Sequence, residues 1–261
     1  MNWKHAISSA ATRIEGHAQI TPAMTTATLW THPVELKLEQ LQHTGSFKAR
    51  GAFNTLLSEP VPEAGVVAAS GGNHGAAVAW AASRLGHRAA IFVPDMAGPA
   101  KIGLIERLGA DLHVVPGAYA NALDAARAHE AETGAMQIHA YDAPATVMGQ
   151  GTLMAEWEDQ GLDADTVLIA VGGGGLIGGA MAWLDGRRNI VAVEPETSCA
   201  LNAALAAGAP CDVEVSGVAA NALGARRIGD ICFDLAQSTG VSSVLVSDAA
   251  ITEAQVLLWR E

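Results

Sequence analysis

The chain has 261 residues and a formal net charge of −12, and half of its residues are apolar. This length and apolar content suit one large α/β domain or two small ones, and they exclude an intrinsically disordered chain. The acidic balance argues against nucleic acids and anionic membrane surfaces as partners, because both prefer basic patches.

The two chain features that bear on the cellular setting are the cysteines and the N-terminal residues. Cys199, Cys211 and Cys232 form no CxxC pair, so neither a zinc site nor a disulfide framework is expected. Residues 1–11 contain Lys4 but no apolar core of a signal peptide. We therefore predict a cytoplasmic protein with reduced thiols.

Short apolar runs typical of strands alternate along the chain with alanine-rich runs typical of helices. The predicted strands are Val34–Leu38, Val66–Ser70, Ala89–Pro94, Leu112–Val115, Gln137–Ala140, Val167–Val171, Ile190–Val193 and Val244–Val246. The predicted helices include Gly75–Leu85, Ala100–Leu108, Ala118–Glu132 and Thr146–Gln160, each followed by a glycine or ending near one. This alternation predicts an α/β fold in which parallel sheet is covered by helices on both faces.

One uncharged stretch, Val167–Leu184, is long enough to span a membrane. It contains six glycines, four of them consecutive. A β-branched run followed by a glycine cluster and a second apolar run favours a strand, a loop and a helix over a membrane span.

A glycine-containing cluster, Gln42–Gly51, places Lys48 in the first turn of a predicted helix that Ser46 would cap. A helix N-terminus disfavours an added cation, and this field together with burial lowers the pKa of an amine, as an imine-forming lysine requires. The local chemistry also allows a solvated surface lysine at a helix start.

A second cluster, Ala69–Gly75, follows the strand Val66–Ser70 and opens the next helix. A loop of small residues at a helix start presents backbone N–H groups to an anion such as a carboxylate, and Asn73 and His74 add polar side chains. The same residues also suit a strand-to-helix turn in which Asn73 is only an N-cap.

A third cluster, Gly172–Gly179, follows the strand Val167–Val171. Consecutive glycines let the backbone approach a phosphate at a helix N-terminus. Gly173, Gly175 and Gly178 also satisfy G-x-G-x-x-G, and Glu194 ends the next strand, where a ribose-binding acid is expected in a dinucleotide site. A nicotinamide-dinucleotide site therefore competes with a simple phosphate site. The sequence has no G-K-[ST] and no HExxH, and we expect no metal site.

Together the clusters resemble the serine/threonine dehydratase family of fold-type II pyridoxal 5′-phosphate (PLP) enzymes, the tryptophan synthase β-like group. Leu36–Ala52 resembles the family signature K-x-E-x-x-Q-x-T-G-S-F-K-x-R-G-A, and Ser70–His74 resembles its S-x-G-N-H loop. Gly172–Leu176 resembles its G-G-G-G-L phosphate loop. Thr21-Pro22 and Val193–Pro195 resemble an early T-P and the acid-containing strand end of the family.

The resemblance implies roles for individual residues. Lys48 would form the Schiff base with PLP, Phe47 would pack near its ring, and Asn73 would hydrogen-bond its 3′-hydroxyl. The 5′-phosphate would be bound by Gly172, Gly173, Gly174, Gly175 and Leu176. The substrate carboxylate would be received by Ser70, Gly71, Asn73 and His74.

The resemblance also implies two parallel-sheet domains: a large PLP-binding domain of residues 1–44 and 146–261, and a small domain of residues 45–145, with PLP in the cleft between them. The family continues past the helix Ala249–Glu261, in a part that supplies a Ser, Thr or Cys to the pyridine nitrogen, so the chain is expected to be a fragment or a shortened form. Asn221 departs from a family position that often carries an aspartate.

The implied activity is α,β-elimination, a lyase reaction that converts a small hydroxy amino acid such as serine or threonine into a 2-keto acid and ammonia. Racemisation or β-replacement on the same scaffold, and a non-catalytic or NAD-binding protein, are the alternatives. Because racemases of the family carry a serine at the position of Gly71, we expect little racemisation here. We further expect a homodimer, a small amino acid as substrate and no nucleic-acid or membrane partner.

Overall fold

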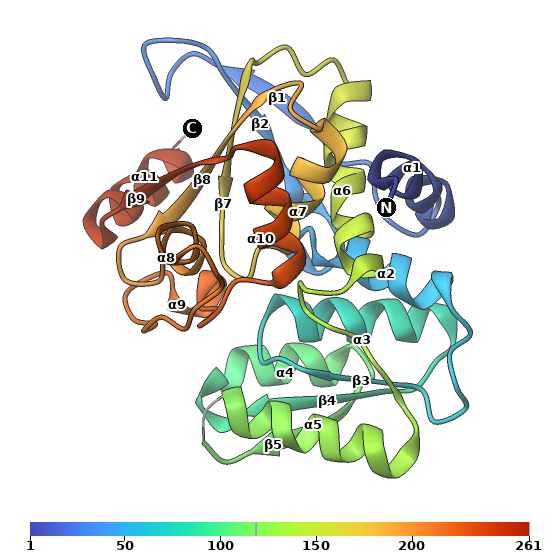
Figure 1. Ribbon diagram of the computed structural model, residues 1–261. Coiled ribbons are helices and arrows are strands. Elements are labelled where there is room, and N and C mark those ends of the chain that lie inside the picture. Colours follow the sequence, from blue (N-terminus) through green and yellow to red (C-terminus); the bar gives the residue numbers. More distant parts are fainter. Residues whose placement is uncertain (118, 261) are drawn as a thin grey trace. The chain divides into compact units, whose positions relative to one another are not determined.

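The computed structural model describes residues 1–117 and 119–260 (Figure 1). The chain divides into two compact units. Unit 1 comprises Met1–Ser8, Thr21–Leu38 and Gln150–Glu261, and unit 2 comprises Ser9–Ile20 and Glu39–Gly149. Two helices, α1 (Trp3–Ile14) and α6 (Pro144–Asp159), contribute residues to both units.

Unit 2 contains a parallel sheet of four strands in the order β5-β4-β3-β6. Its strands are β3 (Val66–Ala69), β4 (Ala89–Pro94), β5 (Asp111–Val115) and β6 (Met136–Gln137). Its helices are η1 (Glu39–Leu41), η2 (His43–Gly45), α2 (Lys48–Ser58), α3 (Asn73–Leu85), η3 (Asp95–Ala97), α4 (Pro99–Arg107) and α5 (Tyr119–Thr133).

Alternate residues of the central strands of unit 2 serve two separate cores. Val66 and Ala68 pack in the core with α2, α3 and α4, whereas Val67 and Ala69 pack in the core with α5. Because successive side chains of a strand point to opposite faces, a strand buried on both faces must be apolar throughout. In Figure 1, α3 and α5 accordingly lie on opposite sides of β3 and β4.

Unit 1 contains a parallel sheet in the order β7-β8-β9 and an antiparallel pair β1-β2. Its strands are β1 (Ala23–Thr26), β2 (Val34–Lys37), β7 (Thr166–Ala170), β8 (Asn189–Pro195) and β9 (Ser242–Val246). Its remaining helices are α7 (Gly175–Leu184), α8 (Ala200–Ala207), α9 (Ala220–Leu223), α10 (Asp230–Thr239) and α11 (Asp248–Arg260).

The predicted α/β fold with parallel sheets is confirmed, including the strand, loop and helix expected within Val167–Leu184. Within the described part of the chain, no helix is both long and apolar enough to cross a membrane. Two predicted boundaries, Ala118 and Glu261, lie outside the described residues.

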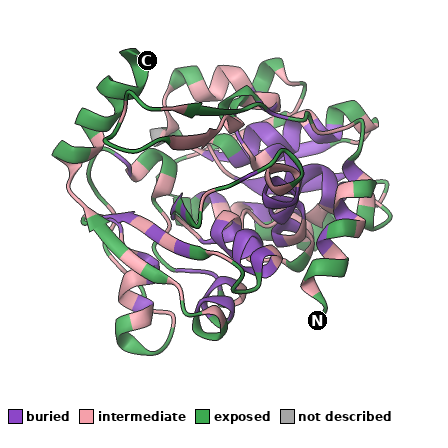
Figure 2. Cartoon of the chain, turned by 90° about the horizontal axis from the view of Figure 1, so that it is seen from above, coloured by how far each residue is buried: buried purple, intermediate pink, exposed green. Residues whose placement is uncertain are grey.

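Two expectations about the elements were wrong, and one strand pairing was not expected. The strand predicted over Gln137–Ala140 is β6, which ends at Gln137, because the chain then bends toward the start of α6. The β1-β2 pair is antiparallel and was not foreseen. The sheet of unit 1 is not covered on both faces: Leu168 of β7 is 69% exposed, and no residue of α11 is buried, as the exposed colours of the helix at the C label in Figure 2 show.

Candidate active site

The segment before Lys48 is a tight double turn in unit 2. Thr44 and Gly45 both adopt left-handed backbone conformations, with φ of 59° and 77°. Such a conformation is strained for threonine and persists only where surrounding contacts impose it. The Gln42 side chain supplies two such contacts, because its Oε1 accepts the backbone N–H groups of His43 and Gln19 at 3.0 and 2.9 Å.

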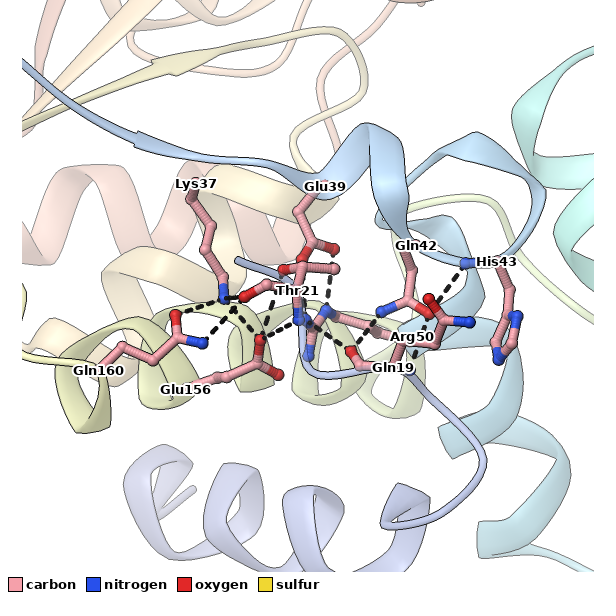
Figure 3. A network of polar contacts seen from close by, with 9 residues as sticks. All are labelled: Gln19, Thr21, Lys37, Glu39, Gln42, His43, Arg50, Glu156 and Gln160. Carbon is pink, nitrogen blue, oxygen red and sulfur yellow. Dashed lines mark hydrogen bonds and ion pairs between the residues drawn. The ribbon is translucent and has the colours of Figure 1, made fainter. Parts of the chain in front are cut away.

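Polar side chains of the same signature form hydrogen bonds and ion pairs within each unit (Figure 3). Within unit 2, Arg50 forms a two-pronged ion pair with Glu39. Within unit 1, the Lys37 ammonium donates to the Glu156 carboxylate, to the Gln160 side-chain oxygen and to the Thr21 carbonyl. The other charged residues of the signature, Lys37, Glu39 and Arg50, thus have structural partners.

Lys48 is the first residue of α2, as predicted. Its Nζ donates a hydrogen bond to the Ala140 carbonyl oxygen at 2.7 Å and lies 5.2 Å from the centre of the Phe47 ring. Burial lowers the pKa of the Lys48 amine to about 8. Among the described residues, no carboxylate forms an ion pair with it, so burial favours the neutral amine, the form in which a lysine can act as a nucleophile.

The expectation that Ser46 caps this helix was wrong. The N-cap residue of α2 is Phe47, and no side chain caps the helix. The hydroxyls of Ser46 and Thr44 are buried and have no hydrogen-bond partner among the described residues. Two unsatisfied buried hydroxyls so close in sequence to the reactive lysine are groups that a bound ligand would satisfy.

The loop Ser70–His74 joins β3 to α3 in unit 2, and α3 begins at Asn73. The Ser70 hydroxyl accepts the Gly72 backbone N–H at 3.2 Å, which leaves its own hydrogen free to donate. Asn73 is exposed, whereas His74 is buried. The first-turn N–H groups of α3 and the Ser70 hydroxyl therefore form a donor set suited to a carboxylate.

His74 is a neutral imidazole in this loop. Its Nε2 donates to the Ile138 carbonyl at 2.9 Å, since a carbonyl can only accept. Burial, reinforced by the nearby Lys48 charge, lowers the pKa of His74 to about 3. His74 therefore carries no charge at neutral pH and cannot serve as a strong acid.

Gly71 has no room for a side chain. An added Cβ would lie 2.4 Å from the Ala97 Cβ and 2.9 Å from the Val93 Cγ1. A residue with a hydroxyl at this position would require the loop or η3 to shift.

The loop Gly172–Leu176 follows β7 in unit 1 and runs into α7, which begins at Gly175. Gly174 has φ of 93°, and an added Cβ would lie 2.5 Å from the Cys232 sulfur. Only glycine suits such a position, and the backbone N–H groups at the start of α7 have no partner within the helix. This loop provides the N–H groups and the helix dipole that a phosphate needs.

Each unit carries one kind of group that suits PLP. An aldehyde needs an amine of lowered pKa, which Lys48 provides, and a phosphate needs a side-chain-free helix start, which Gly174 and its neighbours provide. Lys48 lies in unit 2 and Gly174 in unit 1.

The geometry of Glu194 argues against the dinucleotide alternative. This carboxylate is fully buried and accepts the backbone N–H groups of Leu201 and Asn202, both at 2.8 Å. It therefore caps α8, and it is not available to bind the hydroxyls of a ribose.

Other candidate groups are not assembled into sites. No cluster of three metal-ligating side chains is found in the described ranges, and none of the three cysteines there forms a disulfide. Asn221 is exposed on the short helix α9. No sequence signal identifies Ala140, because any residue supplies a backbone carbonyl and the position of this carbonyl next to Lys48 depends on folding.

Comparison with known proteins is consistent with these features. The chain is 35% identical over 233 residues to L-threonine ammonia-lyase of Thermotoga maritima, covering 87% of this chain and 58% of that protein. It is 32% identical over 264 residues to phenylserine dehydratase of Ralstonia pickettii, covering 98% of this chain and 81% of that protein. The solved structure of maize serine racemase superposes with a TM-score of 0.92 at 28% identity, over 98% of this chain and 80% of that one.

The chain thus spans little more than half the length of the Thermotoga relative. The sequence profile of one family, described as pyridoxal-phosphate dependent enzyme, matches residues 12–261. The match covers almost all of the chain, and the chain therefore belongs to the family of pyridoxal-phosphate dependent enzymes.

Proposed function

We propose that the protein is a PLP-dependent ammonia-lyase that converts a small β-hydroxy amino acid into a 2-keto acid and ammonia. The observation that carries this proposal is the Lys48 amine at the start of α2, which has a lowered pKa and no carboxylate partner among the residues that the structure describes. The names of two relatives, an ammonia-lyase and a dehydratase, support elimination as the reaction class.

The cofactor would be held by residues of both units. Lys48 would form the covalent imine, Phe47 would pack against the ring, and Asn73 would hydrogen-bond the 3′-hydroxyl. The phosphate would be bound by the backbone N–H groups of Gly172, Gly173, Gly174, Gly175 and Leu176. When bound, PLP supplies an aldehyde that condenses with amines and a ring that withdraws electrons from the substrate Cα.

The remaining chemistry belongs to the side chains and backbone of this chain. The substrate carboxylate would be oriented by the Ser70 hydroxyl and the N–H groups of Gly71, Asn73 and His74, which fixes the Cα proton relative to Lys48. The Lys48 Nζ would then take that proton as the general base. Loss of the β-hydroxyl as water and later hydrolysis leave a 2-keto acid and ammonia.

Elimination without racemisation is supported by Gly71. Inversion at Cα requires a second acid/base on the ring face opposite Lys48. Gly71 has no side chain, and the neighbouring atoms of Ala97 and Val93 leave no space for one. The Nε2 hydrogen of His74 does not replace it, because it is already donated to the Ile138 carbonyl.

A keto-acid assay tests the proposal. The purified chain, supplied with PLP, is incubated separately with L-serine, L-threonine, phenylserine and hydroxyaspartate. The keto acid and the ammonia that are released are both measured, and equal amounts of the two are expected. Chiral chromatography of the L-serine reaction is run in parallel. Keto acid from at least one substrate without D-serine is the expected result, and D-serine forming as fast as pyruvate would contradict it.

We also propose a homodimer in a reducing cytoplasm. None of Cys199, Cys211 and Cys232 forms a disulfide in the described part of the chain, which suits a reducing compartment. Sedimentation of the purified chain measures the oligomeric state, and a monomer at micromolar concentration would contradict the dimer.

A further inference from the structure

The segment Ile138–Asp142 of unit 2 connects the groups that the proposed function uses. Three consecutive carbonyls in it accept hydrogen bonds from side chains. Ile138 accepts from His74 Nε2 at 2.9 Å, His139 from the Thr146 hydroxyl at 3.0 Å, and Ala140 from Lys48 Nζ at 2.7 Å. The position of the Lys48 amine therefore depends on the conformation of this segment.

The imidazole of His139 closes the segment on itself. Its Nδ1 accepts the backbone N–H of Asp142 at 2.8 Å and that of Tyr141 at 3.3 Å. A side-chain acceptor that binds the N–H groups two and three residues later stabilises a tight turn, as the Asn and Asp side chains do in Asx-turns. The turn closed by His139 contains Ala140, whose carbonyl holds Lys48.

The acceptor role requires a neutral ring with its hydrogen on Nε2. Burial lowers the pKa of His139, and the Lys48 charge acts in the same direction, while Asp142 opposes them. The neutral form that can accept at Nδ1 is therefore the one favoured near neutral pH.

We propose that His139 is a positioning residue, whose Nδ1 holds the Ala140 carbonyl against the Lys48 amine and so sets where that amine meets an aldehyde. This inference rests on the proposed function, because it takes Lys48 as the imine-forming lysine. His139 needs no contact with the substrate for this role. The position of the Lys48 amine depends on Nδ1 of His139, and not on Nε2 or on packing of the ring.

Four substitutions separate these possibilities. The Oδ1 of His139→Asn occupies nearly the position of Nδ1 and can accept the same N–H groups, whereas His139→Gln places its polar atoms near Nε2. His139→Phe keeps a ring to pack against Tyr141, whose ring centre lies 5.0 Å away, but has no acceptor. His139→Ala removes both features.

The first measurement uses the chain without cofactor. Competitive acetylation across a pH series, read by mass spectrometry of the Lys48 peptide with exposed Lys4 as internal reference, gives the pKa of the Lys48 amine. A second measurement follows the rate at which added PLP forms a borohydride-reducible adduct at Lys48. Circular dichroism and thermal melting establish that each variant is folded.

We expect the Asn variant to resemble the native chain in both measurements. Compared at a pH above the pKa of Lys48, where the amine is neutral in every variant, adduct formation in the Ala, Phe and Gln variants should slow by about tenfold, roughly the effect of losing one well-placed hydrogen bond. The pKa of Lys48 should also fall in these three, because the ammonium form loses its carbonyl acceptor.

An Ala variant that matches the native chain in both measurements would overturn the inference, as would rescue by Gln and not by Asn. If the Ala variant does not fold, the inference is tested by the Asn and Gln variants alone: it holds if only the Asn variant resembles the native chain. Failure of the native chain to form any adduct at Lys48 would instead contradict the proposed function, so the two failures are distinguishable.

Discussion

The Arg50 guanidinium and the Glu39 carboxylate form a two-pronged ion pair across the turn that leads into Lys48. Nε and Nη2 of Arg50 donate to the two carboxylate oxygens at 2.9 and 2.8 Å. The Arg50 side chain is only 2% exposed and that of Glu39 is 11% exposed. Parallel hydrogen bonds between these planar groups fix both distance and orientation, so the pair joins η1 to α2 rigidly.

Removing one partner of this pair should be costly. Glu39→Gln leaves the buried Arg50 charge without its counter-charge, and the free energy of unfolding should fall by roughly 3–5 kcal/mol. Urea denaturation measures the change. Asp124→Asn is the matched control, because the Arg127–Asp124 pair is exposed and 3.8 Å apart, and its loss should cost less than about 1 kcal/mol. Equal losses of unfolding free energy in the two variants would show that the buried pair contributes no more to stability than an exposed one.

Lys48→Ala should abolish the borohydride-reducible PLP adduct and the release of keto acid, because no other lysine lies in a matching sequence. The adduct is located by mass spectrometry of the peptides after reduction. An adduct formed at native yield on another lysine would show that the assignment of Lys48 is wrong.

The lowered pKa of Lys48 should also make stability depend on pH. The folded chain releases this proton at about pH 8, whereas an ordinary lysine releases it near 10.5, so between these values the unfolded chain binds more protons and stability rises with pH. Below pH 8 the cost of burying the ammonium is present in full, up to roughly 3 kcal/mol at about 1.4 kcal/mol per pH unit.

Lys48→Met should therefore stabilise the cofactor-free chain at pH 7 and lose this advantage by about pH 10.5. Urea denaturation at a series of pH values measures the difference from the native chain. Lys4→Met, which replaces an exposed lysine, is the control. A Lys48→Met advantage that is the same at every pH would contradict the explanation by burial of charge.

Gly71→Ser should lose stability and gain no racemase activity. The new Cβ would lie 2.4 Å from the Ala97 Cβ, and such overpacking typically costs roughly 1–3 kcal/mol. Ala97→Gly in the same chain removes the closer of the two clashes and should restore part of the loss, which a double-mutant cycle measures. Additive losses in the cycle, or D-serine formed by the single variant, would contradict this account.

Gly174→Ala should weaken cofactor retention as well as stability. The methyl group would meet the Cys232 sulfur at 2.5 Å and would need a left-handed backbone, with φ of 93°. Gly186→Ala is the matched control, because Gly186 also has a positive φ, 74°, but no atom lies near its added Cβ. PLP affinity, measured by fluorescence titration, should fall by about tenfold or more only in Gly174→Ala, because both variants carry the backbone strain but only Gly174→Ala places a methyl group against a neighbouring side chain. Equal affinity in the two variants would argue against a phosphate site at this loop.

The local sequence pattern was sufficient to predict many of the strands, loops and helices. Val66–Ala69 is apolar at every position, which identifies a strand buried on both faces, and the glycines of Gly172–Gly175 identify a loop between a strand and a helix. Lys48 can be identified from the sequence because it lies within a long signature, Leu36–Ala52. These features depend on residues adjacent in the chain, so no knowledge of the folded arrangement was needed.

Other features were decided by contacts between distant residues. β1 and β2 are four residues each and lack buried positions, so their antiparallel pairing has no strong periodic signal. Ser46 has the chemistry of an N-cap, but the left-handed turn at Thr44 and Gly45 places Phe47 at that position instead. A serine therefore does not become the N-cap when the backbone before the helix approaches from a direction that places another residue there.

The chemistry of individual side chains depended most on the tertiary structure. Glu194 has the sequence position of a ribose-binding acid, yet its carboxylate caps α8. The pKa of Lys48 depends on burial, and its partner is the Ala140 carbonyl, 92 residues along the chain. Desolvation and hydrogen-bond partners are properties of what surrounds an atom in space, and a linear sequence specifies them only through the fold.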